Sequence, residues 1–434
     1  MENDLYEQRP LVELVEIYDS MRVPVKKTDR KSGPYPYYGA SGIADYVDSY
    51  IFDGEYILLA EDGENLKSRN TPIAFLASGK FWVNNHAHIL QANSSSNTRF
   101  LCYALQVSDV NSYLSGSTRP KLTQGDMKRI LVFAPERSTQ QAIANILGSL
   151  DDRIELNRRM NETLEAMAQA LFKSWFVDFD PVIDNALAGG KEVPEELAER
   201  AAVRAALGDK RKPLPAEIRA LFPDEFVYID EMGWIPKGWE VTKIGDELET
   251  ILGGTPARKN KEFWNNGSIP WINSGKVNEF RVIEPSELIT EEAVRKSATK
   301  LLPKRTTLLA ITGATLGQVS LNEIECCANQ SVVGILGKEE LPNEFVYLWI
   351  TNNIEGIISS QTGGAQQHIN KGNVNEASIL LPSQKIMNCF LQIGTSYFDK
   401  ISLNCFSNKT LATLRDTLLP KLLSGELRIP KGEV

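Results

Sequence analysis

The sequence predicts an α+β fold with a pseudo-twofold internal repeat, in which two mixed globular domains alternate with two long helices. The stretch at residues 116–135 returns at residues 363–382 with a constant offset of 247. The same register continues through the helical stretch at 151–172, which matches 398–419. Short apolar runs bounded by Gly, Pro and Asn precede each helical stretch, as expected for strands. Each half is therefore predicted to be a globular domain followed by a helix.

The globular domains are predicted from apolar runs that alternate with a helical pattern. In the first domain, strands are expected at residues 55–60, 73–77, 81–83 and 130–133. A helix is expected at residues 98–109, where the apolar spacing is helical. The second domain repeats this order, with strands at residues 307–311, 332–336 and 378–381 and a helix at residues 344–354.

A long helix is predicted after Pro135, because residues 138–176 contain no Pro and a single Gly, with Ser138 as the expected N-cap. About 38 residues at about 1.5 Å each give a length of about 57 Å. Apolar residues recur every seven positions here and in the matching stretch, which predicts that the two helices pair. The predicted pairing positions, which could also dock partners, are Ile143, Leu150, Asn157, Leu164, Leu171, Tyr397, Asn404, Leu411 and Leu418. A second row is expected at Ile146, Met160, Met167, Ile393 and Leu414.

Asn157 and Asn404 occupy the same position of this pattern in the two helices. A buried polar residue at a pairing position costs stability but selects one register, so the two are predicted to mark the alignment. Alternatively, both face solvent or a partner protein. Between the halves, residues 181–232 are rich in Ala, Glu, Arg and Pro, and they are expected to form a short helix flanked by loops that builds no core.

Composition limits the classes of function. The formal net charge is -9, which argues against a protein that grips nucleic acid by bulk electrostatics. Any such contact must use local clusters, such as the one at residues 258–261, with a basic partner supplying the rest. The acidic start and the absence of a long apolar run predict a cytoplasmic protein. Five cysteines without CxxC spacing indicate reduced thiols, and the pair His86 and His88 is interpreted as strand residues, not metal ligands.

Catalytic motifs are missing from the sequence. It contains no GxxxxGK[ST] phosphate loop, no GxGxxG and no Asn or Asp followed by Pro-Pro-aromatic, the motif with which adenine methyltransferases hold the target amine. The chain is therefore predicted to be non-catalytic, with neither a bound cofactor nor a metal of its own.

Polar residues gather instead in glycine-bounded loops at residues 115–122, 312–318 and 362–371. Gln and Asn can read adenine, and Arg and Lys can read guanine, in the major groove. Two weaker matches, of 57–66 with 307–316 and of 84–90 with 328–334, indicate that the halves share a scaffold but differ where a ligand would be read. The candidate DNA-binding residues are Lys67, Arg69, Ser117, Thr118, Arg119, Lys121, Arg258, Lys259, Thr312, Thr315, Gln318, Gln366, Gln367, His368 and Lys371. The alternative is that these are ordinary turn residues with surface amides.

Several of these motifs together resemble the specificity subunits of Type I restriction-modification enzymes. Residues 233–246, 252–277 and 308–321 are similar to the second target-recognition domain of that family. Residues 35–63 and 115–127 are similar to the first, and 156–182 with 221–226 to the central conserved region. The resemblance covers nearly the whole chain.

The resemblance implies two α/β target-recognition domains separated by two long antiparallel helices. Each domain would read one half of a bipartite target in double-stranded DNA, and the helices would set the unread spacer and dock two modification (methyltransferase) subunits. S-adenosylmethionine, ATP and Mg would be bound by those subunits and by motor-nuclease restriction subunits. The implied segments are a first recognition domain at 1–137, a helix at 138–180, a connection at 181–232, a second recognition domain at 233–383 and a C-terminal helix at 384–434.

The two domains depart from one another. The first lacks the GGTP sequence of the second, and Arg119 and Pro120 stand where the second has Gln366 and Gln367, so different bases should be read. Trp264 and Trp271 are expected to pack in the core and not against bases. Two rival interpretations are the recognition half of a fused restriction-methylation enzyme, and a structural dimeriser without base preference.

Overall fold

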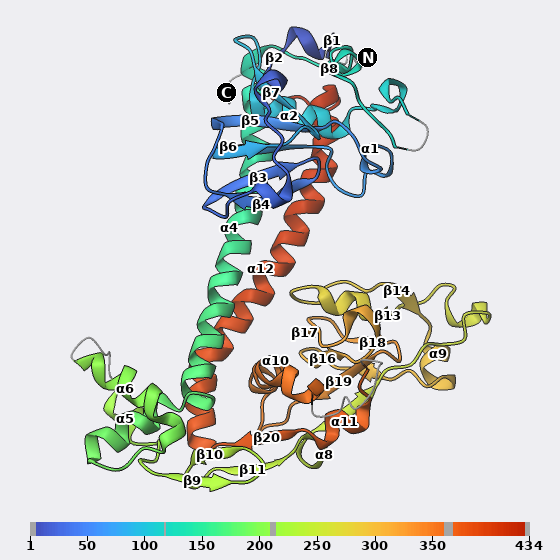
Figure 1. Ribbon diagram of the computed structural model, residues 1–434. Helices are drawn as coiled ribbons and strands as arrows, with labels where there is room; N and C mark the ends of the chain where they lie inside the picture. Colours follow the sequence, from blue (N-terminus) through green and yellow to red (C-terminus); the bar gives the residue numbers. More distant parts are fainter. Residues whose placement is uncertain (1–5, 117–118, 209–213, 360–367, 430–434) are drawn as a thin grey trace. The chain divides into compact units, whose positions relative to one another are not determined.

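The computed structural model describes residues 6–116, 119–208, 214–359 and 368–429. The chain forms two compact units. The first unit comprises residues 1–156 and 408–434, and the second comprises 157–407. Each unit contains one globular domain and parts of both long helices (Figure 1). Four predicted DNA contacts, Ser117, Thr118, Gln366 and Gln367, lie outside the described residues.

The first domain is built on a six-stranded sheet with the order β2-β7-β5-β6-β3-β4. Its strands are β2 (Val15–Ile17), β3 (Tyr35–Gly39), β4 (Gly42–Val47), β5 (Phe52–Ala60), β6 (Ala74–Val83) and β7 (Ala87–Ala92). The strands predicted at 73–77 and 81–83 are one continuous strand, β6. The predicted helix is confirmed as α2 (Thr98–Val107), which buries Phe100 and Leu101 and is capped by the Asn97 side chain.

The second domain contains two four-stranded sheets. One has the order β12-β19-β16-β17, formed by β12 (Glu249–Leu252), β16 (Thr307–Ala310), β17 (Val319–Leu321) and β19 (Val332–Leu336). The other has the order β14-β13-β18-β15, formed by β13 (Ile269–Ile272), β14 (Glu287–Ile289), β15 (Leu301–Leu302) and β18 (Cys326–Ala328). The helix predicted at 344–354 is confirmed as α10 (Asn343–Ser359).

The repeat is confirmed in the order and the bounds of the elements. α3 (Gln124–Met127) and α11 (Lys371–Glu376) begin 247 residues apart. β8 (Leu131–Phe133) pairs with β1 (Gln8–Pro10), and β20 (Ser378–Leu381) pairs with β11 (Glu240–Lys243). The long helices α4 (Arg137–Phe176) and α12 (Gln384–Ser424) also begin 247 residues apart. The predicted N-cap is wrong, because Ser138 already lies in the first turn of α4.

The two predicted rows of helix positions differ in burial: the first is buried or half-buried throughout, whereas in the second only Met160 and Ile393 are half-buried. Ile143, Asn157 and Asn404 are buried, and the other six predicted pairing positions are half-buried. In the second row, Ile146, Met167 and Leu414 are exposed. The buried row lies one position later in each heptad, at Leu147, Asn161, Ala168 and Trp175 in α4 and at Gly394, Ile401 and Leu422 in α12. The second buried row therefore lies four residues after the first row, whereas it was predicted three residues after it.

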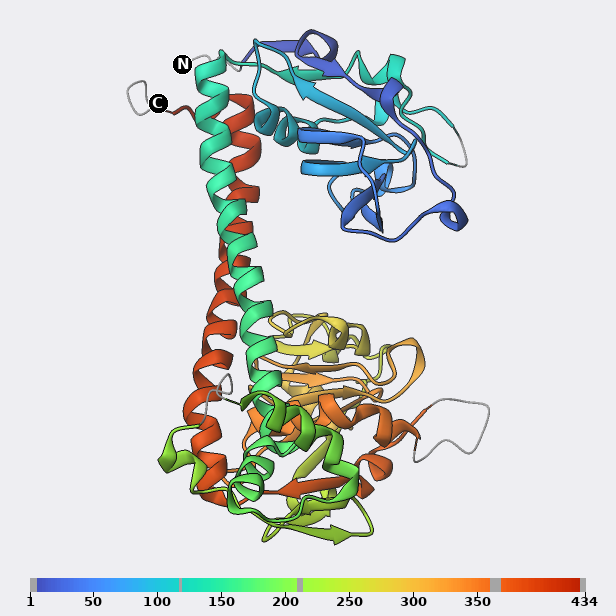
Figure 2. The ribbon, with the colours of Figure 1, turned by 60° about the vertical axis from the view of Figure 1, so that its left-hand side comes forward.

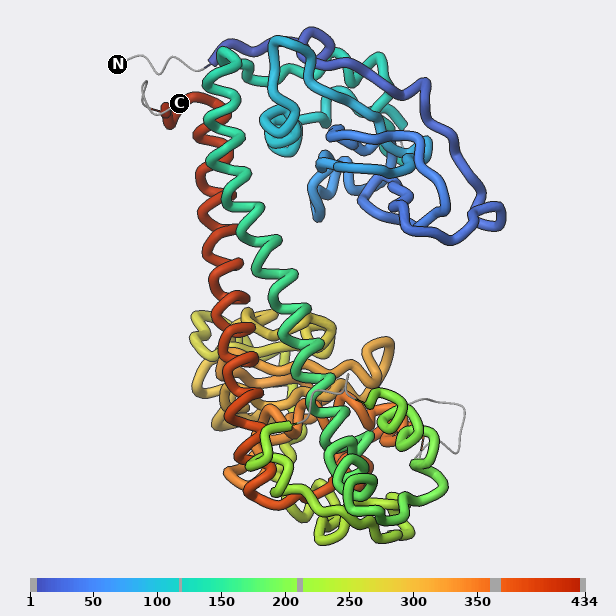
Figure 3. The backbone as a smooth tube through the Cα atoms, turned by 90° about the vertical axis from the view of Figure 1, so that its left-hand side faces the viewer, coloured from blue at the N-terminus to red at the C-terminus, as the bar shows by residue number. Residues whose placement is uncertain are grey.

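An asparagine pair lies between the two helices in the second unit. Asn404 donates from Nδ2 to Oδ1 of Asn161 at 2.8 Å, and Asn161 donates to Sγ of Cys405 at 3.5 Å. In the first unit, Arg415 donates to Asp151 at 2.7 Å. The partner number falls as α4 advances, so the helices are antiparallel, and Figures 2 and 3 show them side by side. Asn161 and Asn404 thus form a polar pair between the two helices.

The connecting segment builds core, which corrects the prediction of a short helix flanked by loops that builds none. It forms α5 (Asp180–Gly189), α6 (Ala198–Ala206) and α7 (Ala216–Arg219). Val182 and Phe222 join the buried cluster around Trp175. Its charges are paired, since Arg200 binds Asp180 and Arg204 binds Asp184. β9 (Phe226–Ile229) pairs with β10 (Gly233–Pro236), so strand pairing begins before residue 233.

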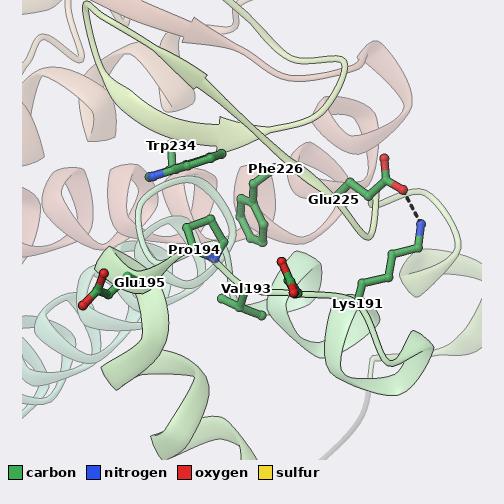
Figure 4. A pocket seen from close by; sticks show the side chains of 8 residues that line it. Lys191, Val193, Pro194, Glu195, Glu225, Phe226 and Trp234 are labelled. Atoms are coloured by element: carbon green, nitrogen blue, oxygen red, sulfur yellow. Dashed lines mark hydrogen bonds and ion pairs between the residues drawn. The ribbon is translucent and has the colours of Figure 1, made fainter.

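A hollow of about 630 Å³ lies beside this segment, and Figure 4 shows side chains that line it. Trp234, Phe226 and Pro194 line it, and the ion pair between Lys191 Nζ and Glu225 Oε1, at 2.6 Å, lies along one side. All five cysteines are free, and three of them are buried. Among the described residues, every helix is too short or too polar to cross a membrane.

A buried ion pair attaches the second domain to α4 within the second unit. Arg281 donates to the Glu165 carboxylate at 2.6 Å, and the Tyr347 hydroxyl donates to the other oxygen at 2.9 Å. The Arg281 guanidinium also lies over the rings of Tyr347 and Phe398. Burial raises the pKa of Tyr347 to about 12, so its hydroxyl keeps the proton that it donates.

Candidate nucleic-acid interface

In the second domain, polar loops meet at one end of the β12-β19-β16-β17 sheet. The neighbouring strands are antiparallel, so β12 and β16 end where β19 and β17 begin. The loops at residues 253–260, 311–318 and 329–331 therefore leave the sheet together. These loops contain three of the uncharged candidates for reading bases, Thr312, Thr315 and Gln318.

Backbone hydrogen bonds fix these loops to one another. Gly254 N donates to Ala328 O at 2.8 Å, and Ile311 N donates to Ser331 O at 2.9 Å. A Cβ added at Gly253 would lie 2.1 Å from the Asn329 carbonyl oxygen, so only glycine permits this approach. Ile369 N donates to Ile311 O at 3.1 Å, which brings residues 368–371 to the same end of the sheet.

The uncharged polar side chains at this end come from several loops. Gln318 and His368 are exposed, and Thr315 donates to the Thr312 carbonyl at 3.3 Å. The Thr255 hydroxyl donates to the Gln330 side chain at 2.5 Å. Thr255 and Gln330 were not predicted as contacts, although Gln330 lies in the weakly repeated stretch at 328–334. Lys371 is half-buried at the start of α11, next to the capping box of Asn370 and Asn373.

In the loop at residues 253–260, the side chain of Arg258 is held in place by its neighbours. Its guanidinium lies 3.8 Å from the ring centre of Trp264 and donates to Glu287 at 2.7 Å. This hydrogen bond lowers the pKa of Glu287. The Arg258 side chain is nevertheless 51% exposed, so a ligand can reach it. Trp271 is buried, which confirms its predicted core role, while Trp264 is half-buried and supports Arg258.

In the first domain, loops meet at the corresponding end of the sheet. β5 ends at Ala60, where β7 begins at Ala87. Leu122 N donates to Glu61 O at 2.8 Å, which brings residues 119–122 to this end. This bond is the counterpart of that from Ile369 to Ile311, since the two donors and the two acceptors match in the repeat. The repeat therefore docks the same segment in the same way in both domains.

Carboxylates surround the basic candidates of the first domain. Arg119 is 65% exposed and binds Asp62 Oδ1 at 2.7 Å, and Lys121 lies 3.2 Å from Glu61 Oε1. His86 Nδ1 is 2.9 Å from the other Asp62 oxygen. Arg119 and Lys121 are thus accessible, but a phosphate or base would compete with carboxylates for them. Lys67 and, in the second domain, Lys259 are exposed.

Arg69 has a different position from the one predicted. Its backbone is left-handed, with φ of 52°, and its guanidinium donates to the carbonyls of Gln106 at 3.1 Å and Ser108 at 2.6 Å. Burial lowers its pKa. Arg69 therefore closes the C-terminal end of α2, and this geometry argues against the predicted DNA contact.

Comparison with known proteins identifies two matching stretches. A family model described as the Type I restriction modification DNA specificity domain matches residues 3–166 and 236–403. The HindI specificity subunit of Haemophilus influenzae is 33% identical over 333 residues, which are 71% of this chain and 72% of that protein. The MjaIX specificity subunit of Methanocaldococcus jannaschii is 26% identical over 418 residues, 92% of this chain and 88% of that one. Both relatives are Type I restriction enzyme subunits.

A solved structure shares the fold. The crystal structure of the S subunit of a Type I restriction-modification system from M. genitalium matches with a TM-score of 0.57 and 16% sequence identity. The match covers 98% of this chain and 97% of that one. The two stretches matched by the family model begin in the two globular domains and end in the two long helices, in agreement with the repeat.

Proposed function

Because the chain belongs to the family of Type I restriction-modification DNA specificity proteins, we propose that each of its globular domains reads one half of a split DNA target. The chain is a non-catalytic specificity subunit. The observation that carries the proposal is the repeated docking bond, from Leu122 to Glu61 and from Ile369 to Ile311. It places matching segments at matching sheet ends, and a repeated scaffold with different side chains suits two different half-targets.

The two sheet ends favour different contacts. The sheet end of the second domain has exposed Gln318 and Gln330, whose amides suit adenine. It also has Arg258, which its contact with Trp264 holds in place and which suits guanine or a phosphate. The first has Arg119 and Lys121 beside carboxylates. An acidic side chain can itself accept a hydrogen bond from the cytosine amino group. The two domains should therefore read unlike sequences.

The helices would supply the rest of the assembly. We infer that α4 and α12 set the length of the unread spacer and dock two copies of a modification methyltransferase. Exposed apolar residues recur at matching positions of the two helices, Leu156 with Leu403 and Met167 with Leu414. Such a repeated surface suits two identical partners. S-adenosylmethionine, ATP and Mg would be bound by the modification and restriction subunits, and the complex would act in the cytoplasm.

Arg258→Ala is expected to reduce base discrimination in one half of the target by about 5- to 150-fold, which corresponds to about 1–3 kcal/mol for a bidentate base contact. The measurement is methylation by the complete modification complex of DNA carrying single base changes in either half. Arg295→Ala is the matched control, because Arg295 is 71% exposed on α9 (Glu291–Lys296) of the same domain.

Equal losses in both halves would contradict the assignment of Arg258 to one reader. Methylation that ignores base changes in both halves, with the unaltered chain, would favour the rival interpretation of a structural dimeriser.

A further inference from the structure

A buried histidine in the first domain is held between two hydrogen-bond acceptors. His88, in β7, is 1% exposed. Its Nδ1 lies 2.6 Å from Oδ2 of Asp19, and its Nε2 lies 2.9 Å from the Leu122 carbonyl oxygen. A carbonyl or carboxylate oxygen can only accept, so both ring nitrogens must donate. The geometry therefore requires the doubly protonated, positively charged imidazole.

Asp19 provides the matching negative charge. Its carboxylate also accepts from Ile89 N at 2.9 Å and from the Gln124 side chain at 3.1 Å. Burial alone would raise the pKa of Asp19, but the hydrogen bonds from His88, Ile89 and Gln124 outweigh burial and lower it. Asp19 is therefore ionised, and it joins β7 to α3, the helix that follows residues 119–122.

Other charged groups complete the surroundings of His88. Glu61 Oε2 lies 4.0 Å from its Nδ1. Arg22 donates to Glu61 at 2.5 Å and lies 3.6 Å from Asp19, and Lys121 lies on the other Glu61 oxygen. The two carboxylates, Asp19 and Glu61, thus face three cationic groups, so each carboxylate is paired within the cluster and one positive charge is in excess.

Leu122 connects this cluster to the candidate DNA contacts. It is fully buried, its N–H donates to Glu61 O, and its carbonyl accepts from His88. It directly follows Lys121 in the chain and lies three positions after Arg119. A hydrogen bond on each side of this residue fixes the direction in which that segment leaves the sheet.

At the strand position that matches His88, the second domain has a valine. In the sheet register, His88 pairs with Leu59, and the repeat counterpart of Leu59 is Leu309, which pairs with Val333. Val333 is fully buried and can make no side-chain hydrogen bond. The backbone hydrogen bond from Ile369 to Ile311 is kept, but the matching strand position supplies no histidine to the Ile369 carbonyl.

We propose that His88 and Asp19 are positioning residues for reading the first half-target. The proposal rests on the proposed function, in which residues 119–122 serve the first reader. The charged pair fixes the Leu122 peptide, and through it the positions of Arg119 and Lys121. Base discrimination in the first half of the target then depends on a buried ion pair that the second half does not need.

The test compares His88→Gln with the double variant Asp19→Asn/His88→Gln in the complete modification complex. The single variant offers an amide oxygen to the Asp19 carboxylate, which repels it. In the double variant, the new amide at position 19 can donate to the amide oxygen at 88, whose NH₂ group can donate to Leu122. Because one buried acceptor is left unsatisfied, H88Q is expected to lose about tenfold in discrimination, which corresponds to about 1.4 kcal/mol. The double variant should recover most of it.

The readout is methylation of DNA with base changes in either half, together with thermal unfolding of each variant. H88Q should affect the first half only. Thr250→Val is the reciprocal control, because the Thr250 hydroxyl donates to Asn375 of α11 at 2.6 Å in the second domain. It should affect the second half only.

Three results would overturn the proposal: H88Q leaves discrimination intact, H88Q weakens both halves alike, or the double variant does no better than H88Q in folding or discrimination. The proposed function fails separately, if the unaltered chain directs no methylation to a split target.

Discussion

Replacing Arg281 with alanine is expected to lower the free energy of unfolding of the second unit by about 3–5 kcal/mol, because it leaves the Glu165 carboxylate buried without its partner. The Arg281 side chain is fully buried and that of Glu165 is 9% exposed, so water cannot replace the lost guanidinium. Tyr347 and Gln169 would still donate to the other Glu165 oxygen, but neither carries a charge. The stability loss should be among the largest for any single substitution in the chain.

Urea unfolding followed by tryptophan fluorescence measures this effect. Six of the seven tryptophans lie in the second unit, at positions 175, 234, 239, 264, 271 and 349. Lys243→Ala is the control, because the ion pair of Lys243 with Glu376 is exposed on both sides and should contribute less than about 1 kcal/mol. The double variant E165Q/R281M should recover much of the loss, because it removes both charges. If R281A were no more harmful than K243A, the ion pair would not anchor the domain.

Replacing Leu156 and Leu403 with glutamate is expected to abolish the binding of both modification subunits. Leu156 is 49% exposed and Leu403 is 66% exposed, and they occupy matching positions of α4 and α12. A carboxylate in an apolar contact is strongly unfavourable unless it is paired. Because the two sites are repeats of one another, L156E alone and L403E alone should each leave one partner bound.

The stoichiometry of the complex, measured by native mass spectrometry with the purified partner methyltransferase, tests this expectation. Glu162→Gln with Lys409→Gln is the control, because these exposed positions match in the repeat but lie about 120° away around each helix, at about 100° per residue. Circular dichroism should show unchanged helix content in all variants. Two bound partners on the L156E/L403E chain would contradict the proposed docking surface.

The repeat and its helices were predictable because periodicity and offset are properties of the sequence alone. The equal starting offsets of α4 and α12 and of α3 and α11 follow from it. The second helix row was not predictable in the same way. Ile146 and Leu147 are both apolar, so hydrophobicity does not tell which of them faces the other helix. At positions 160 and 161, the polar Asn161 is buried and the apolar Met160 is only half-buried, the reverse of what hydrophobicity predicts. Only the position of the partner helix decides between them.

The candidate contacts were predictable as loops but not as a site. Thr255 follows β12 and Gln330 precedes β19, so the pairing of these two strands brings the two side chains into contact. Arg69 looked like a DNA contact, yet its acceptors, Gln106 and Ser108, lie far along the chain. Phe222 packs against Trp175, but the charged and proline-rich sequence of the connecting segment predicted no core there. Each case depends on contacts between residues distant in sequence, which periodicity does not record.

Sequencing of methylated DNA from cells that carry the partner methyltransferase tests most directly whether one chain reads two halves of a split target across a fixed gap. Cells with the unaltered chain are compared with cells whose chain carries second copies of residues 151–157 in α4 and 408–414 in α12. Seven residues add about 10.5 Å of helix, or about three base pairs. We predict one split motif in each case, with the same two halves and a gap about three base pairs longer in the extended chain. A contiguous motif, changed halves with an unchanged gap, or the same methylation without the chain would contradict it.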